Sequence, residues 1–175
     1  MEEDGKLVQL IFRGNEVVAE KTDGNIIHLI RGSDLLASDA ENARTYYHYA
    51  SNELGCISHV VEDREILNRY EYDVWGNLAV CEEKVPNRFL FTGQQYDPVT
   101  QQYYLWARFY NPAIVRFTQE DTYRGDGLNL YAYCRNNPVC YVDPSGIDCV
   151  SKNEDVAAKL TSSAPKPTSQ VTKFG

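Results

Sequence analysis

Residues 1–85 alternate short apolar runs with polar, glycine-containing breaks. The apolar run at residues 26–30 follows Gly24–Asn25, a pair that supports a tight turn between two strands. No proline occurs before Pro86, so this part of the chain can form continuous strand ladders. We therefore predict antiparallel hairpins over residues 1–85.

Two stretches in this region resemble each other. The first, at residues 47–55, reads YHYASNELG, and the second, at residues 70–78, reads YEYDVWGNL. Each pattern predicts a strand, a turn containing glycine and a returning strand. Since one hairpin cannot bury its own apolar face, neighbouring units must stack beside each other. The prediction is a mainly β fold with a curved sheet, whose open edge favours self-association.

Residues 86–146 contain shorter apolar runs and more turn residues. YYLWARFY and AIVRF have the aromatic and β-branched composition of strands, and Asp97–Pro98 and Asn111–Pro112 are turn-forming pairs. The chain has 13 tyrosines, a residue suited to half-buried sheet surfaces. We favour a role in sheet packing over a ligand-stacking platform.

The run LNLYAYCRNNP has two interpretations. Strand alternation would place Leu128, Leu130, Ala132 and Cys134 on one face, whereas the residues that flank the run are helix start and stop signals. We predict a short helix near residues 128–135. Beyond residue 146 the chain is rich in small polar residues, so residues 147–175 are predicted to be a disordered tail.

The aromatic half resembles a known family. RFLFTGQQYDPVTQQYYLWARFYNP, RFTQEDTYRGDGLNLYAYCRNNP and YVDPSG are similar, in order and spacing, to the Rhs repeat-associated core of YD-repeat proteins. YEYDVWGNL is similar to the tyrosine–aspartate repeat itself. The resemblance implies degenerate YD-repeat hairpins at residues 1–85, the core at 86–146 and a variable tail at 147–175. The whole would be a fragment of a β-shell.

The family resemblance also implies a chemistry. Such shells enclose a C-terminal cargo, often a toxin, and in several members the core closes the shell and cuts the cargo free. The cut is attributed to two aspartates that work as an aspartic protease with the help of an arginine. Carried over by motif, these residues are Arg108 in WARFYNP, Asp121 in RFTQEDTYRG and Asp143 in YVDPSGI. The scissile bond would join Ile147 and Asp148.

A pair of close carboxylates suits this chemistry, because one is pushed toward its protonated form while the other stays charged. The pair then offers an acid and a base, and a nearby guanidinium separates the two roles. Local roles explain the same residues, since Asp143 and Asp121 can each cap a turn and Arg108 can be a buried ion-pair partner. The chain departs from the family pattern at three positions, Ile147 in place of leucine, Thr122 in place of proline and Val115 in place of glycine. A valine at this position predicts strain in its turn.

Charge and composition narrow the function further. The net charge of −8 disfavours nucleic-acid binding, and no apolar run is long enough to predict an export signal or a membrane span. The five cysteines form no C-x-x-C pair and are not grouped with the histidines in the pattern of a zinc site, so we expect reduced thiols and neither metal nor cofactor.

Three hypotheses remain open. The chain is the closing part of a shell, with or without self-cleavage; a structural or cell-surface interaction module; or a truncated remnant of a larger protein. Its expected partners are the rest of a YD-repeat shell or a C-terminal toxin with its immunity protein. The resemblance suggests a secreted or cell-surface location.

Overall fold

The structure is a computed structural model that describes residues 2–3, 6–13, 16–23, 25–31, 35–40, 45–123 and 128–152. Its largest element is a nine-stranded antiparallel sheet in which neighbours in sequence are neighbours in space, as the hairpin pattern predicts. The strands are β1 (Glu2–Glu3), β2 (Lys6–Arg13), β3 (Glu16–Thr22), β4 (Asn25–Arg31), β5 (Leu35–Ala40), β6 (Thr45–Ser51), β7 (Ile57–Glu62), β8 (Glu65–Tyr72) and β9 (Leu78–Glu83).

A second unit follows, built from shorter elements. A four-stranded antiparallel sheet has the order β10-β11-β12-β13, and β14 pairs with β15 in a separate ribbon. Its elements are the 3-10 turn η1 (Phe91–Gly93), β10 (Gln95–Asp97), β11 (Gln102–Leu105), β12 (Arg108–Asn111), β13 (Arg116–Phe117), the 3-10 turn η2 (Cys134–Asn136), β14 (Tyr141–Val142) and β15 (Val150–Ser151).

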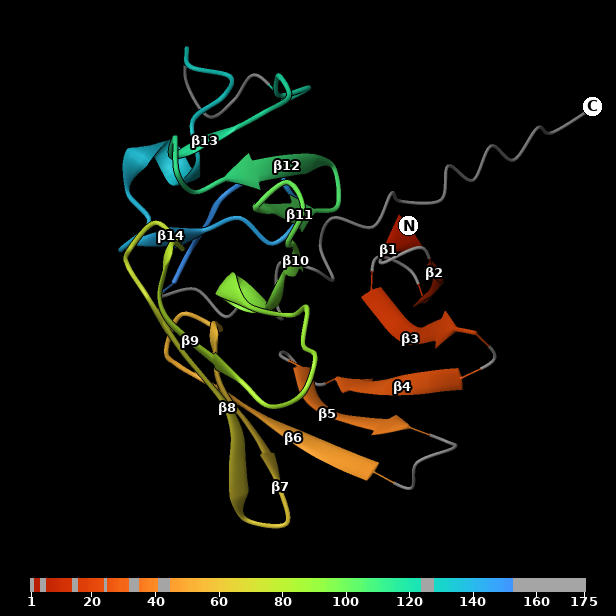
Figure 1. The fold of residues 1–175 in the computed structure, drawn as a ribbon. Coiled ribbons are helices and arrows are strands. Elements are labelled where there is room, and N and C mark those ends of the chain that lie inside the picture. Colours follow the sequence, from red (N-terminus) through yellow and green to blue (C-terminus); the bar gives the residue numbers. More distant parts are fainter. Residues whose placement is uncertain are drawn as a thin grey trace, which may run out of the picture.

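The large sheet is open and curved, as expected. Register shifts interrupt several strand pairs, for example at Ile30/Arg31 and at Ala50/Ser51. Such bulges increase the local twist and bend the strand that carries them. Figure 1 shows the sheet bending from β1 on the right to β9 on the left, with the green and blue second unit lying above the end formed by β6–β9.

The two similar stretches form turns with the same hydrogen-bond pattern. Asp73 Oδ1 accepts the N–H groups two and four residues later, at 2.8 and 2.9 Å, and Gly76 between them has φ of 91°. Asn52 Oδ1 accepts the equivalent N–H groups at 2.9 and 3.1 Å, and Gly55 has φ of 73°. A side-chain acceptor and a left-handed glycine therefore close both hairpins.

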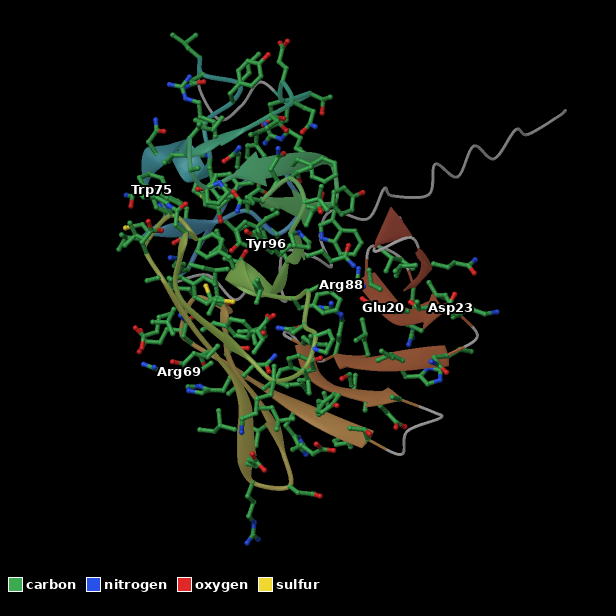
Figure 2. The ribbon with its side chains drawn as sticks, in the orientation of Figure 1. Glu20, Asp23, Arg69, Trp75, Arg88 and Tyr96 are labelled. Atoms are coloured by element: carbon green, nitrogen blue, oxygen red, sulfur yellow. The ribbon has the colours of Figure 1, made fainter. Side chains whose placement is uncertain are left out.

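One continuous apolar core joins the sheet to the second unit. Its members include Leu29 and Leu35 from the sheet and Phe91 and Tyr110 from the second unit. A buried ion pair spans the same boundary, with Arg88 Nε 3.0 Å from Glu20 Oε1. Figure 2 shows these two side chains between β3 and the segment that enters the second unit. The second unit therefore folds against the sheet.

Aromatic rings fill the centre of the second unit. Tyr110 stacks on Tyr133 with ring centroids 4.1 Å apart, and both side chains are almost fully buried. The tyrosine hydroxyls donate to backbone carbonyls, Tyr103 to Gly76 and Tyr110 to Trp75, both at 2.8 Å. Tyr103 and Tyr110 are therefore packing residues whose hydroxyl groups are satisfied by the turn of the hairpin before them.

The helix predicted near residues 128–135 is replaced by turns. Ala132 forms an isolated bridge with Arg116, and helical hydrogen bonding is limited to the 3-10 turn at Cys134–Asn136. The physical reason is that carbonyls of this run bind other segments, because Leu130 accepts the N–H of Asp121 and Tyr131 accepts that of Phe117. Asn136 and Asn137, at the end of the run, belong to this 3-10 turn and its cap instead of ending a longer helix.

The predicted tail starts too early. Cys149 and Val150 are buried, and β15 pairs with β14 through Tyr141↔Ser151 and Val142↔Val150. The N–H of Lys152 donates to Cys140 at 3.0 Å, so the fold includes residues 147–152. Residues 153–175 lie outside the described residues.

Strain was predicted in the turn that contains Val115. This β-branched residue has φ of 59°, in the left-handed region, in the turn before β13.

Candidate functional site

Arg108 is the first residue of β12, and its side chain lies on the buried face of that strand. Alternation along β12 directs Arg108 and Tyr110 inward, so a cation enters the aromatic core with only 5% of its surface exposed. The guanidinium carbon lies 3.6 Å from the centre of the Phe117 ring, a cation–π contact. A charge buried this deeply needs partners that satisfy its N–H groups.

Both predicted aspartates are among these partners. The nitrogen Nη2 of Arg108 lies 2.7 Å from Asp121 Oδ2 and 3.7 Å from Asp143 Oδ2. Arg108 Nε donates to the carbonyl of Gly146 at 2.5 Å, and Nη1 donates to the carbonyl of Leu130 at 3.1 Å. The structure therefore brings Arg108, Asp121 and Asp143 together, although they come from three separate segments.

Asp121 follows β13 and is 8% exposed. Its Oδ1 accepts the N–H of Tyr123 at 2.7 Å, while its own N–H donates to the carbonyl of Leu130 at 3.0 Å. One carboxylate oxygen thus closes the local turn and the other pairs with the guanidinium. Asp121 therefore both caps its own turn and pairs with Arg108.

Asp143 follows β14 and organises the turn that carries the predicted scissile bond. Its Oδ1 accepts N–H groups from Ser145 at 3.1 Å, Gly146 at 2.7 Å and Ile147 at 3.3 Å. Burial raises the pKa of Asp143 to about 6, although these N–H donors and Arg108 oppose the shift. A minor fraction of this carboxyl is therefore protonated at neutral pH, and the fraction grows as the pH falls toward 6.

Gly146 lets the turn approach the tip of the β11–β12 hairpin. It has φ of 70°, and a methyl group added to it would lie 2.2 Å from the carbonyl oxygen of Leu105. Only glycine combines this backbone conformation with so close a contact. The next residues open toward solvent, since Ile147 is 38% exposed and Asp148 is also exposed. Water therefore has access to the Ile147–Asp148 linkage.

Three contributors to this site were not predicted. Phe117 stacks on the guanidinium, the Leu130 carbonyl accepts from it, and the side chain of Gln94 donates to the carbonyl of Pro144 at 3.2 Å. The only sequence signal for Gln94 was its position in the aromatic motif that carries the family resemblance. Contacts across 50 residues of chain depend on the fold and leave no local pattern.

The described part of the chain contains no group of three or more histidine, cysteine or acidic side chains placed to hold a metal ion. None of its five cysteines forms a disulfide, and Cys81 and Cys140 are exposed. Among the same residues, no helix is long and apolar enough to cross a membrane. The chemistry that the arrangement can offer is that of two carboxyl groups and one guanidinium.

Comparison with known proteins finds relatives in sequence and in fold, while no protein-family model matches the chain. The tRNA3(Ser)-specific nuclease WapA of Bacillus spizizenii is 34% identical over 154 residues, which are 82% of this chain and 6% of that protein. The tRNA nuclease WapA of Bacillus subtilis is 41% identical over 110 residues, which are 58% of this chain and 5% of that protein.

A solved structure of the Photorhabdus luminescens Tc holotoxin pore has a similar fold. The match has a TM-score of 0.65 and 20% identity, and it covers 86% of this chain and 8% of that chain. This chain therefore spans less than a tenth of each of these three proteins. The likenesses in sequence and fold support the relationship to Rhs-related toxin proteins that the aromatic motifs indicate.

Proposed function

We propose that this chain is an Rhs-type core module that closes one end of a larger β-shell and cuts its own backbone after Ile147. One observation carries the proposal. A single buried guanidinium contacts two carboxylates and the Gly146 carbonyl, and the predicted scissile bond follows within two residues. Local capping alone would not require the three side chains to meet.

The two carboxyl groups have environments that suit different roles. Asp121 forms the closer ion pair with Arg108, so we assign it as the base that takes a proton from water. Asp143, with its raised pKa, is the proton donor. The water oxygen bonds to the carbonyl carbon of Ile147, the bond to the Asp148 nitrogen breaks, and that nitrogen receives a proton. The products are a carboxyl group on Ile147 and a free amino group on Asp148.

Asp143, one of the two proposed catalytic residues, belongs to the segment that is cut, because it also accepts the N–H of Ile147. The reaction would therefore be intramolecular and would occur once per chain. Its rate constant should not depend on protein concentration. The residues from Asp148 onward, with any cargo joined to them, would be the part severed by the cut.

A second candidate function is a structural module without catalysis. It is favoured by Asp143 Oδ1, whose three backbone donors already give this residue a complete role in shaping the turn. The buried Arg108 would then tie three segments of the second unit together. In both cases the partner is the remainder of a longer shell, and we propose a secreted or cell-surface location from the family resemblance.

Intact mass of the purified chain over time tests the proposal. We expect a peptide that begins at Asp148 to appear with first-order kinetics. The rate should rise as the pH falls from 8 to 6, because the proton donor Asp143 is present in its acid form below its pKa of about 6. Asp121→Asn and Asp143→Asn should each abolish the cut.

Asp97→Asn is the matched control. Asp97 also precedes a proline and also accepts N–H and hydroxyl donors within its turn, from Val99 at 3.0 Å and Thr100 at 2.7 Å. It should be cut at the wild-type rate. A wild-type chain that keeps its full mass between pH 5 and pH 8 would contradict the catalytic proposal and leave the structural module.

A further inference from the structure

The turn before the predicted scissile bond is held through its backbone. Three consecutive carbonyls, those of Pro144, Ser145 and Gly146, each accept a hydrogen bond from the second unit. The donors are the side-chain amide of Gln94 at 3.2 Å, the N–H of Ala107 at 3.2 Å and Arg108 Nε at 2.5 Å. On the other side of the turn, Asp143 Oδ1 accepts the N–H groups of residues 145–147.

Gln94 is placed rigidly for this contact. It follows the left-handed Gly93, its own N–H donates to the Phe91 carbonyl at 3.0 Å, and its carbonyl accepts the N–H of Leu90 at 3.0 Å. The backbone on both sides of the side chain is therefore fixed. Its amide reaches across to Pro144, which is 50 residues away in sequence.

We infer that the proposed cleavage site recognises the main chain of residues 144–146 and that Gln94 is a positioning residue for it. The inference rests on the proposed function, and it names the substrate as a turn of the chain's own backbone. Side chains of the turn contribute little to this recognition, apart from the requirement for glycine at residue 146.

The chain offers a matched pair of glutamines for the test. Gln95 is the neighbouring residue and is also half-buried, yet its Nε2 is buried without a hydrogen-bond partner in the described structure. Gln94→Met and Gln95→Met each replace an amide by an apolar chain of similar length. Only Gln94→Met removes a donor from the turn.

Cleavage rates of the two variants should differ. We expect Gln94→Met to be cut about 10-fold more slowly than the wild type or slower still, since small displacements of reacting groups have large effects on rate. The pH at half-maximal rate should stay unchanged, because Asp121 and Asp143 are intact. Gln95→Met should be cut at the wild-type rate. A shifted pH midpoint, or equal rates in both variants, would overturn the inference.

Hydrogen exchange separates this inference from the proposed function. In an Asp121→Asn background, which prevents the proposed cut, adding Gln94→Met should speed amide exchange of Ser145, Gly146 and Ile147, and adding Gln95→Met should not. If the wild type is never cut, the catalytic proposal fails, and hydrogen exchange alone then tests whether Gln94 holds the turn. Faster exchange with Gln94→Met then supports the backbone recognition, and unchanged exchange overturns it.

Discussion

One arginine of the nine-stranded sheet and one arginine of the second unit lie in opposite surroundings. In the sheet, Arg69 forms ion pairs with Glu71 and with Glu82 (3.9 Å to the latter), and all three side chains are more than 40% exposed. Figure 2 shows Arg69 on the outside of the molecule, away from the second unit. In the second unit, the side chains of Arg108 and its two aspartates are at most 7% exposed.

Backbone conformation differs between the regions in the same direction. Left-handed residues in the sheet, such as Asp63 and Arg64 with φ of 45° and 72°, occupy an exposed hairpin turn. In the second unit, the left-handed Gly146 packs against the backbone of Leu105. The sheet therefore depends on ladders between neighbours in sequence, whereas the second unit depends on contacts between distant segments.

The largest predicted effect on stability comes from replacing one arginine in each region by leucine. Arg108→Leu leaves two buried carboxylates without their partner and should lower the free energy of unfolding by about 3–5 kcal/mol. Arg69→Leu removes only exposed ion pairs and should change it by about 0.5 kcal/mol or less. Urea denaturation measures both, and equal losses would show that the regions do not differ in this way.

The next effect sharpens the role of close backbone contact. Gly146→Ala adds a methyl group at φ of 70° against the Leu105 carbonyl, and should cost about 3 kcal/mol from backbone strain and overpacking together. Gly93→Ala has nearly the same φ, 68°, but its new methyl group would lie 3.6 Å from its nearest neighbour, Gly55 O.

Gly93→Ala should therefore cost only the strain, about 1 kcal/mol. The difference between the two glycines isolates the steric contact. Thermal melts of both variants provide the comparison. Losses of the same size would mean that the turn at Gly146 can move away from the hairpin.

The smallest predicted effect on stability comes from replacing a valine by glycine, and it has opposite signs in the two regions. Val115→Gly relieves a left-handed valine and should stabilise the chain by about 0.5–1 kcal/mol, after the entropy of glycine is subtracted. Val80→Gly, in the middle of β9, should instead destabilise it by about 1 kcal/mol, because glycine weakens a strand. Two urea midpoints that shift in the same direction would contradict this expectation.

The sequence predicts the sheet better than the second unit, for a physical reason. A hairpin can be predicted from local sequence, since the alternation of apolar and polar residues and a turn such as Asp73–Asn77 lie within a few residues of each other. Strain at Val115 was predicted from the resemblance to the family, in which glycine is usual at this position. The meeting of Arg108, Asp121 and Asp143 was suggested by the resemblance to a family, and no spacing rule would have required it.

Errors also arose where distant contacts decide the structure. The helix near residues 128–135 was wrong because Leu130 uses its carbonyl to bind Asp121 and Arg108. The early start of the tail was wrong because β15 returns to pair with β14. The contact of Gln94 with Pro144 joins two loops, so neither loop alone predicts it.

The strand β15 begins just after the proposed cut, and its pairing would hold the severed peptide in place. A peptide with its new amino terminus at Asp148 would keep the ladder to β14, the buried Cys149 and Val150, and the bond from Lys152 to Cys140. Cleavage of the Ile147–Asp148 bond and release of the severed peptide would thus be separate events. The nicked chain would migrate as one particle under native conditions, and its two pieces would part only when this short ribbon unzips.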